Sequence, residues 1–232
     1  MFRTGIEGTK MGKILIPSNG PDDWKRFLAK PDLHWAKGYS ARTLAHAWES
    51  ASNFPPEVRD LISAAFGPAE LLFAIPEHKT ALAGGTRESQ SDVFVLARHH
   101  SGLATYTIEG KVDEPFGPTV GEWLVDASDG KLERLKFVCD LLGIEDCPHD
   151  VHYQLLHRTA SALVESDRFD TKLAGMIVHS FSPENRWKEA FERFVRVMGW
   201  THEFGTEIRL SVPRGKTLML GWASGSQEFR QA

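Results

Sequence analysis

Three residues in the middle of the chain, Asp92, Glu109 and Lys111, have the types and spacing needed to hold a divalent metal for phosphodiester chemistry. Asp92 is the second residue of a segment over 91–97 whose remainder is continuously apolar, and Glu109 and Lys111 lie at the end of an alternating run over 104–111. Both runs are typical of β-strands. An even-length loop centred on His100-Ser101 would join them as a hairpin and set Asp92 directly opposite Glu109.

Two carboxylates in that arrangement need a positive charge between them. Directly opposed residues of an antiparallel pair have Cβ atoms about 4.5–5.5 Å apart, and like charges at that separation are destabilising. Lys111 lies on the same face as Glu109 and supplies one charge, while Gly110 points away and leaves its carbonyl at the edge of the site. Carboxylate and carbonyl oxygens suit magnesium or manganese, which would supply the remaining charge.

The chemistry expected of this set is attack by a metal-activated water on a phosphodiester. The metal would polarise the phosphate and lower the pKa of its water, and Lys111 would orient that water or stabilise charge on the phosphate oxygens. An ordinary structural role is the alternative. In that interpretation Glu109 and Lys111 form a surface ion pair and Asp92 caps its strand.

The surrounding sequence predicts an α/β domain without a dividing linker. Apolar spacing predicts helices over 40–52, 56–66, 131–142, 151–166 and 182–198, the last with Ser182 as N-cap and Trp187 in its buried stripe. Further strands are expected over 70–75, 174–180, 207–212 and 217–222. Residues 1–39 are expected to form an N-terminal extension, with a strand-like run at 14–16 and a short helix over 22–29, and residues 40–232 the main domain.

The order of these elements and the Ser-Asp92-Val-Phe-Val and Ile-Glu109-Gly-Lys111 segments resemble the PD-(D/E)XK nuclease superfamily. The resemblance covers about residues 40–180 and implies a restriction-endonuclease-like αβββαβ core, with a mixed central sheet flanked by helices and a C-terminal helix and two strands added. It also implies metal-dependent cleavage of DNA or RNA. Ser91 replaces the proline of the superfamily's name, and the Tyr that often follows the Gln of its core helix is missing here.

The resemblance assigns roles to further residues. Asp92, Glu109 and Lys111 would bind metal and activate water, and a Glu from the first core helix would be Glu49. A Gln on the helix after the Glu-x-Lys strand corresponds to Gln154. The expected catalytic set, taken together, is Asp92, Glu109, Lys111, Glu49 and Gln154, and the expected metal ligands are Asp92, Glu109, Gly110 and Glu49. Arg158, one turn past Gln154, is the residue expected to meet a substrate phosphate.

Composition narrows the class of protein only in part. The net charge of −4 argues mildly against a protein that coats nucleic acid, because such binding needs many Lys and Arg facing phosphates. DNA, RNA and a small phosphoester all stay open as substrates, as does a non-catalytic nuclease-like binding module. No apolar window is long enough to span a membrane. We expect a cytoplasmic protein, and a homodimer is compatible with the sequence.

The two cysteines, Cys139 and Cys147, are too few for a disulfide framework. They could form a zinc site with His149 and His152, but there is no Cys-x-x-Cys and the spacing is poor. A buried structural Cys139 is the favoured interpretation.

Overall fold

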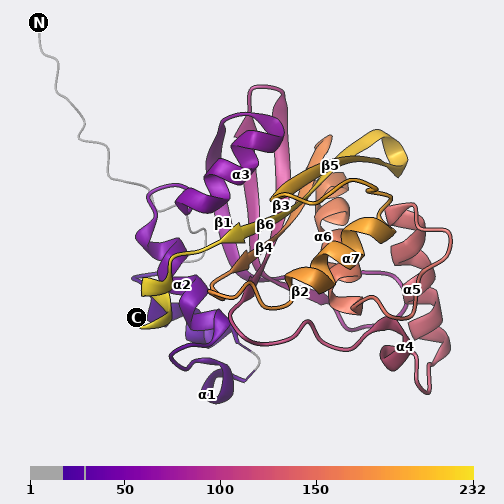
Figure 1. Cartoon of the computed structure of the whole chain (residues 1–232), viewed down its shortest axis with the longest axis horizontal. Helices are drawn as coiled ribbons and strands as arrows, with labels where there is room; N and C mark the ends of the chain where they lie inside the picture. The colour runs from indigo at the N-terminus through magenta and orange to yellow at the C-terminus, as the bar shows by residue number, and fades with distance from the viewer. Residues whose placement is uncertain (1–17, 29) are drawn as a thin grey trace, which may run out of the picture.

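The computed structural model describes residues 18–28 and 30–232, which form a six-stranded mixed sheet with helices on both faces (Figure 1). The expected mixed α/β sheet with flanking helices is therefore confirmed. The strands are β1 (Ala69–Thr80), β2 (Ser89–His99), β3 (Gly102–Lys111), β4 (Leu173–Ser180), β5 (Glu207–Val212) and β6 (Lys216–Ser224). They lie in the order β1-β2-β3-β4-β6-β5.

The sheet combines an antiparallel half with a parallel centre. β1, β2 and β3 pair antiparallel, β4 is parallel to both β3 and β6, and β5 is antiparallel to β6. The expected hairpin is confirmed: Val93 pairs with Ile108 and His99 with Gly102, so His100 and Ser101 form the turn. Continued by one residue, this register sets Asp92 opposite Glu109.

Helices of the N-terminal half cover one face of the sheet. α2 (Ser40–Ser50) places Leu44, Ala45 and Trp48 in the core. α3 (Pro56–Phe66) begins with Pro56 in its first turn. It is followed by Gly67, whose φ of 81° is costly for residues with a Cβ. Two shorter elements precede them, the 3-10 helix η1 (Pro21–Phe27) and α1 (Pro31–His34). Trp24 of η1 is buried in the same core, so this segment packs onto the domain.

Helices of the C-terminal half cover the opposite face (Figure 1). They are α4 (Val120–Trp123), α5 (Asp129–Leu142), α6 (Tyr153–Arg168) and α7 (Lys188–Val197), and two short 3-10 helices, η2 (Pro213–Gly215) and η3 (Gln227–Arg230), complete the chain. α6 buries Leu155, Leu156, Ala160 and Leu163, as its spacing predicts, against β3 and β4. The sheet therefore separates two apolar cores, one on each side.

Some boundaries differ from the expectations. The helix expected over 182–198 begins only at Lys188, because Asn185 and Trp187 have left-handed φ values of 51° and 69°. Trp187 is consequently 37% exposed instead of buried. β1 continues five residues beyond the expected end at Ile75, across Pro76 to Thr80. The expected strand at 14–16 lies outside the described residues.

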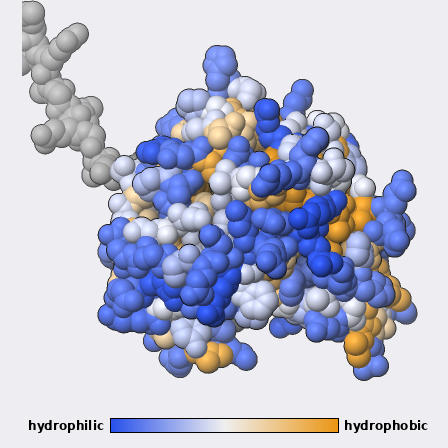
Figure 2. All heavy atoms as spheres, viewed as in Figure 1, coloured by the Kyte–Doolittle hydropathy of each residue, from blue (hydrophilic) through white to orange (hydrophobic). Residues whose placement is uncertain are grey.

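Hydrophilic side chains predominate on the face shown in Figure 2, and hydrophobic atoms appear between them in several places, among them the side where α4 and α5 lie. Val125, which follows α4, and Leu132 of α5 are exposed. Among the described residues, no helix combines the length and the apolar character that crossing a membrane requires.

Candidate active site

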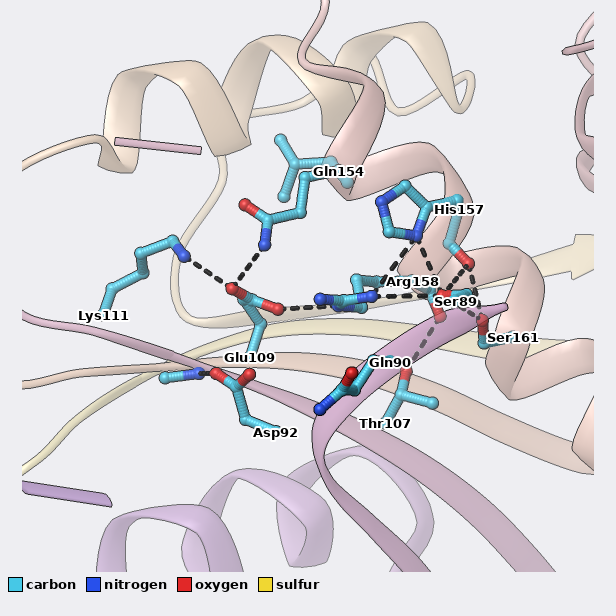
Figure 3. A network of polar contacts seen from close by, with 12 residues as sticks. Ser89, Gln90, Asp92, Thr107, Glu109, Lys111, Gln154, His157, Arg158 and Ser161 are labelled. Carbon is cyan, nitrogen blue, oxygen red and sulfur yellow. Dashed lines mark hydrogen bonds and ion pairs between the residues drawn. The ribbon is translucent and has the colours of Figure 1, made fainter. Parts of the chain in front are cut away.

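The side chains of Lys111, Gln154 and Arg158 converge on the carboxylate of Glu109, at the end of β3 (Figure 3). Lys111 Nζ lies 2.5 Å and Gln154 Nε2 lies 2.7 Å from Oε1, while Arg158 Nε lies 2.8 Å from Oε2. Glu109 and Lys111 are only 2% and 5% exposed. They form a buried ion pair, so the alternative of an ordinary surface ion pair does not hold.

Two threonines of β3 fix α6 over this site. Thr105 Oγ1 donates to the carbonyl of Ala162, and Thr107 Oγ1 donates to the carbonyl of Arg158, both at 3.0 Å. Because side chains alternate along a strand, Thr105, Thr107 and Glu109 all point toward α6. The same alternation that the sequence predicts thus brings Gln154 and Arg158, one turn apart on α6, onto Glu109.

Asp92 lies on the neighbouring strand β2, and its carboxylate is held by the backbone of β3. Oδ2 accepts a hydrogen bond from Gly110 N–H at 2.7 Å. N–H and C=O of one strand residue point to the same side of the strand, so the Gly110 carbonyl also lies on the β2 side. A Cβ at Gly110 would lie 3.3 Å from Asp92 Oδ2 and 3.1 Å from Leu44 Cδ2, so the close approach depends on glycine here.

Glu77 of β1 is a third carboxylate of the site, which is absent from the set expected on sequence grounds. The pairs Pro76–Val93 and His78–Ser91 flank it, so Glu77 lies opposite Asp92 and the two continue the row to Glu109. Gln90 Nε2 donates to Glu77 Oε2 at 2.7 Å. The backbone φ of Glu77 is 52°, which is unusual for a non-glycine strand residue and marks a local constraint at this position.

The sequence does contain a signal for Glu77. Gly84-Gly85 marks the centre of the loop between β1 and β2, and a hairpin centred there sets Glu77 opposite Asp92 by the same reasoning used for His100-Ser101. Pro76 favours an end of the strand at Ile75, because proline cannot donate to a ladder. This proline is accommodated within the strand instead.

The three carboxyl groups differ in pKa because their neighbours differ. Burial and then the charge of Asp92 raise the pKa of Glu77 to about 8, and burial and then the charge of Glu109 raise the pKa of Asp92 to about 7. Burial acts in the same direction on Glu109, but Lys111 and Arg158 outweigh it and lower its pKa to about 2. At neutral pH the site therefore contains an ionised Glu109 beside carboxyl groups that retain protons.

These groups border a cavity of about 330 Å³ between the sheet, α6 and the N-terminal segment. Polar residues of the sheet, of α6 and of the segment after β3 form one part of its wall: Glu77, Gln90, Asp92, Glu109, Glu114, Gln154 and Arg158. The segment before α2 and the start of α2 form the other part: Leu28, His34, Tyr39, Ser40 and Ala41. Glu114 accepts hydrogen bonds from the backbone N–H groups of Ser40 and Val112 at 2.7 and 2.9 Å. That contact holds the start of α2 at the mouth of the cavity.

Glu49 does not join these residues. It lies eight residues past Ala41 on α2, about 12 Å further along the helix axis at 1.5 Å per residue. Its Oε1 accepts hydrogen bonds from Ser18 Oγ at 2.5 Å and Trp24 Nε1 at 2.7 Å, and it borders a separate cavity. Glu49, which the family resemblance places in the catalytic set, therefore anchors the N-terminal segment instead.

Hard oxygen donors are present for a metal, although they do not enclose one. Throughout residues 18–28 and 30–232, no group of three or more His, Cys, Asp or Glu side chains is arranged to hold a metal ion. This includes the cysteine–histidine set near Cys139. The donors that remain are Asp92, Glu109 and the Gly110 carbonyl, together with Gln154 Oε1, a buried oxygen with no hydrogen-bond partner in the described part of the chain.

Fold and site together define a mixed α/β protein with a buried carboxylate–lysine–arginine cluster beside a small cavity. A family model described as a domain of unknown function (DUF6946) matches residues 17–227, and the chain belongs to this family. The match includes the segment before α2 that walls the cavity. No curated protein and no solved structure matched the chain.

Proposed function

We propose that the protein is a metal-dependent phosphodiesterase that cleaves DNA or RNA. The observation that carries this proposal is the convergence of Asp92, Lys111 and Arg158 around Glu109 at one end of a cavity. Carboxylates next to a lysine are the combination that metal-assisted hydrolysis of phosphate esters uses. The antiparallel order β1-β2-β3 followed by a parallel β4 is also in keeping with the expected αβββαβ core.

Asp92, Glu109 and the Gly110 carbonyl are the residues that would hold the metal. Magnesium and manganese favour oxygen ligands, and magnesium usually binds through one or two carboxylates and retains several waters, so two carboxylates suffice. The raised pKa of Asp92 supports this assignment, because a cation would replace the proton that the carboxyl group retains. When bound, such a metal supplies Lewis-acid activation of a phosphate and of water.

The remaining side chains act on charge and orientation. Lys111 Nζ donates one of its three N–H groups to Glu109. The ammonium also lies 5.1 Å from the centre of the Phe116 ring, a contact that helps to fix its position. Its other donors can stabilise charge that develops on phosphate oxygens. Gln154 holds Glu109 through its amide N–H and leaves Oε1 to accept a hydrogen bond from a water molecule.

The direct test compares wild type with Lys111→Met on single- and double-stranded DNA and RNA, with Mg²⁺, Mn²⁺ or EDTA. We expect metal-dependent cleavage by wild type and a loss of about 10²–10³-fold in rate for Lys111→Met, typical of removing one charge-stabilising donor. Lys136→Met is the matched control, because Lys136 is exposed and, among the described residues, pairs only with Asp140 on α5. Cleavage at the same rate by both variants, or no cleavage by wild type under any condition, contradicts the proposal.

The size of the cavity supports a second candidate, the hydrolysis of a small phosphoester. A space of about 330 Å³ walled by the N-terminal segment is near the lower end of small-molecule sites. The net charge of −4 also favours a small substrate over a long polyanion. Competition between an oligonucleotide and small phosphodiesters in the same assay distinguishes the two substrates.

A non-catalytic binding module is the alternative from another class. It is supported by the lack of an enclosing metal cluster among the described residues and by the hydrogen bonds that both Glu109 oxygens already accept from Lys111, Gln154 and Arg158. Homodimerisation and a cytoplasmic location stay predictions.

A further inference from the structure

Arg158 presents one part of its guanidinium to the cavity while the rest is fixed. The side chain is nearly buried, at 8% exposed, and borders the cavity. Nε donates to Glu109 Oε2 at 2.8 Å and Nη1 donates to Ser89 Oγ at 3.1 Å. In the part of the chain that the structure describes, Nη2 has no hydrogen-bond partner and is not among the buried unpaired atoms. Nη2 therefore keeps accessible surface, on a side chain that borders the cavity.

Ser89, at the start of β2, is the centre of the polar cluster behind Arg158 (Figure 3). Its Oγ lies 2.8 Å from His157 Nδ1 and 2.8 Å from Ser161 Oγ, and it accepts the bond from Arg158 Nη1. Ser89 and Ser161 are 4% and 0% exposed, so water does not replace these contacts readily. Ser161 shares its single hydroxyl proton between Ser89 Oγ and the His157 carbonyl, which lies 2.7 Å from Ser161 Oγ. Ser89 Oγ therefore accepts from Arg158 and Ser161 and keeps its own proton for His157.

The protonation state of His157 determines which atom donates and which accepts in the hydrogen bond between Ser89 and His157. Burial and then the adjacent Arg158 charge lower the pKa of His157 well below 6.5, so the imidazole is neutral. Nδ1 faces both the Ser89 hydroxyl and, at 3.4 Å, Arg158 Nη1, which can only donate. These partners assign Nδ1 as the acceptor, so Ser89 donates to His157 and keeps its lone pairs toward Arg158.

We infer that Ser89 and His157 position the Arg158 guanidinium so that Nη2 binds a phosphate oxygen of the substrate in the cavity. Ser89 and His157 are positioning residues, and the ligand class is a phosphate ester. The inference rests on the proposed function for the identity of that ligand. Arg binds phosphate through a planar fork whose direction must be set, and here Glu109 and Ser89 set it from two sides.

The test measures the dissociation constant of a single-stranded phosphorothioate oligonucleotide in the presence of Ca²⁺, by fluorescence anisotropy. We expect Ser89→Ala to weaken binding about tenfold, which corresponds to about 1.4 kcal/mol. Ser89→Thr keeps the hydroxyl and should bind within about twofold of wild type. Ser91→Ala is the matched control, because Ser91 is fully buried on the same strand and its Oγ has no hydrogen-bond partner within residues 18–28 and 30–232.

A double-mutant cycle separates positioning from general loss of structure. Arg158→Lys should weaken oligonucleotide binding by a similar factor, and adding Ser89→Ala to it should have little further effect, because the interaction that Ser89 directs is already lost. His157→Phe provides an independent variant that removes the Nδ1 acceptor. Calcium affinity, measured by calorimetry, should not change in Ser89→Ala, whereas a structural defect would lower it too.

Three outcomes overturn the inference: no oligonucleotide binding by wild type, a dissociation constant for Ser89→Ala within twofold of wild type, or additive effects in the cycle. Failure of the proposed function has a different signature. In that case the binding pattern holds, but no condition yields cleavage that depends on Lys111. Cleavage that depends on Lys111 with unchanged binding by Ser89→Ala contradicts the phosphate subsite alone.

Discussion

Arg158 and Glu109 form a buried ion pair in which Nε and Oε2 are 2.8 Å apart, although 49 residues separate them in the chain. The pair joins α6 to β3 at the cavity and, with Lys111, keeps Glu109 ionised. The proposed metal site requires Glu109 in its ionised form, because a carboxylate must be deprotonated to act as a ligand. The same contact therefore supports both the local fold and the proposed chemistry.

Breaking this pair should destabilise the protein strongly. We expect Arg158→Gln to lower the free energy of unfolding by about 3–5 kcal/mol, because Glu109 loses a buried charge partner. Urea denaturation at pH 7 measures the change. Arg214→Gln is the control: its pair with Asp167 is also close, at 2.6 Å, but Arg214 is 58% exposed, so the cost should be at most about 1 kcal/mol. Equal effects of the two substitutions would show that burial does not determine the stability of these pairs.

Stability should fall as the pH rises from about 6.5 to 8. Native Glu77 and Asp92, with pKa values of about 8 and about 7, retain protons that the unfolded chain has released above its values of 4.5 and 3.8. The stability that these two groups contribute is therefore complete below their unfolded-state pKa values. It is lost as the pH rises through their folded-state pKa values. Glu109 titrates below this window in both states, whereas the unfolded His157 loses its proton near its ordinary pKa of 6.5, which opposes the trend weakly at the lower end of the window.

Substitution identifies the groups responsible for this pH dependence. Urea denaturation of Glu77→Gln at pH 6.5 and pH 8 should show a smaller decrease in stability than wild type, because the glutamine cannot ionise. Glu70→Gln, on the same strand but 53% exposed at its side chain, serves as the control. A decrease of the same size in Glu77→Gln and wild type would show that Glu77 does not cause the pH dependence.

Glu49 should affect stability without affecting cleavage. Glu49→Ala removes the acceptor of Trp24 Nε1, and leaving this partly buried donor unpaired costs about 1–3 kcal/mol, whereas Ser18 Oγ can still donate to the Gly20 carbonyl. Urea denaturation measures that loss, and the cleavage assay should show the wild-type rate under conditions where the variant is folded. A large drop in the cleavage rate with an unchanged free energy of unfolding would show that Glu49 takes part in catalysis.

The hairpin register is predictable from the sequence because it depends only on local features. Turn residues at His100-Ser101 and alternation along 104–111 are enough to set Asp92 opposite Glu109. Gln154 and Arg158 follow from helical spacing and from the family resemblance. Glu77 follows the same local rule through Gly84-Gly85, but Pro76 obscures the strand that carries it.

Other features depend on contacts that sequence patterns do not contain. The late start of α7 reflects left-handed Asn185 and Trp187, where Trp187 Nε1 donates to the Asp113 carbonyl across 74 residues. The position of Glu49 depends on how far α2 extends beyond the cavity and on Trp24 packing beside it. The Ser89–His157 cluster joins residues 68 apart, and nothing in either segment indicates the other.

The most direct test of the central claim is calorimetric titration of Mn²⁺ into wild type, Asp92→Asn and Glu49→Gln at pH 7.5 or above, where Asp92 is ionised. The proposed metal site predicts binding by wild type, loss of binding in Asp92→Asn, and wild-type affinity in Glu49→Gln. Asparagine keeps the shape of the side chain, so the loss would report the missing charge on the ligand. Binding retained by Asp92→Asn, or no binding by wild type, would contradict a metal site at Asp92 and Glu109.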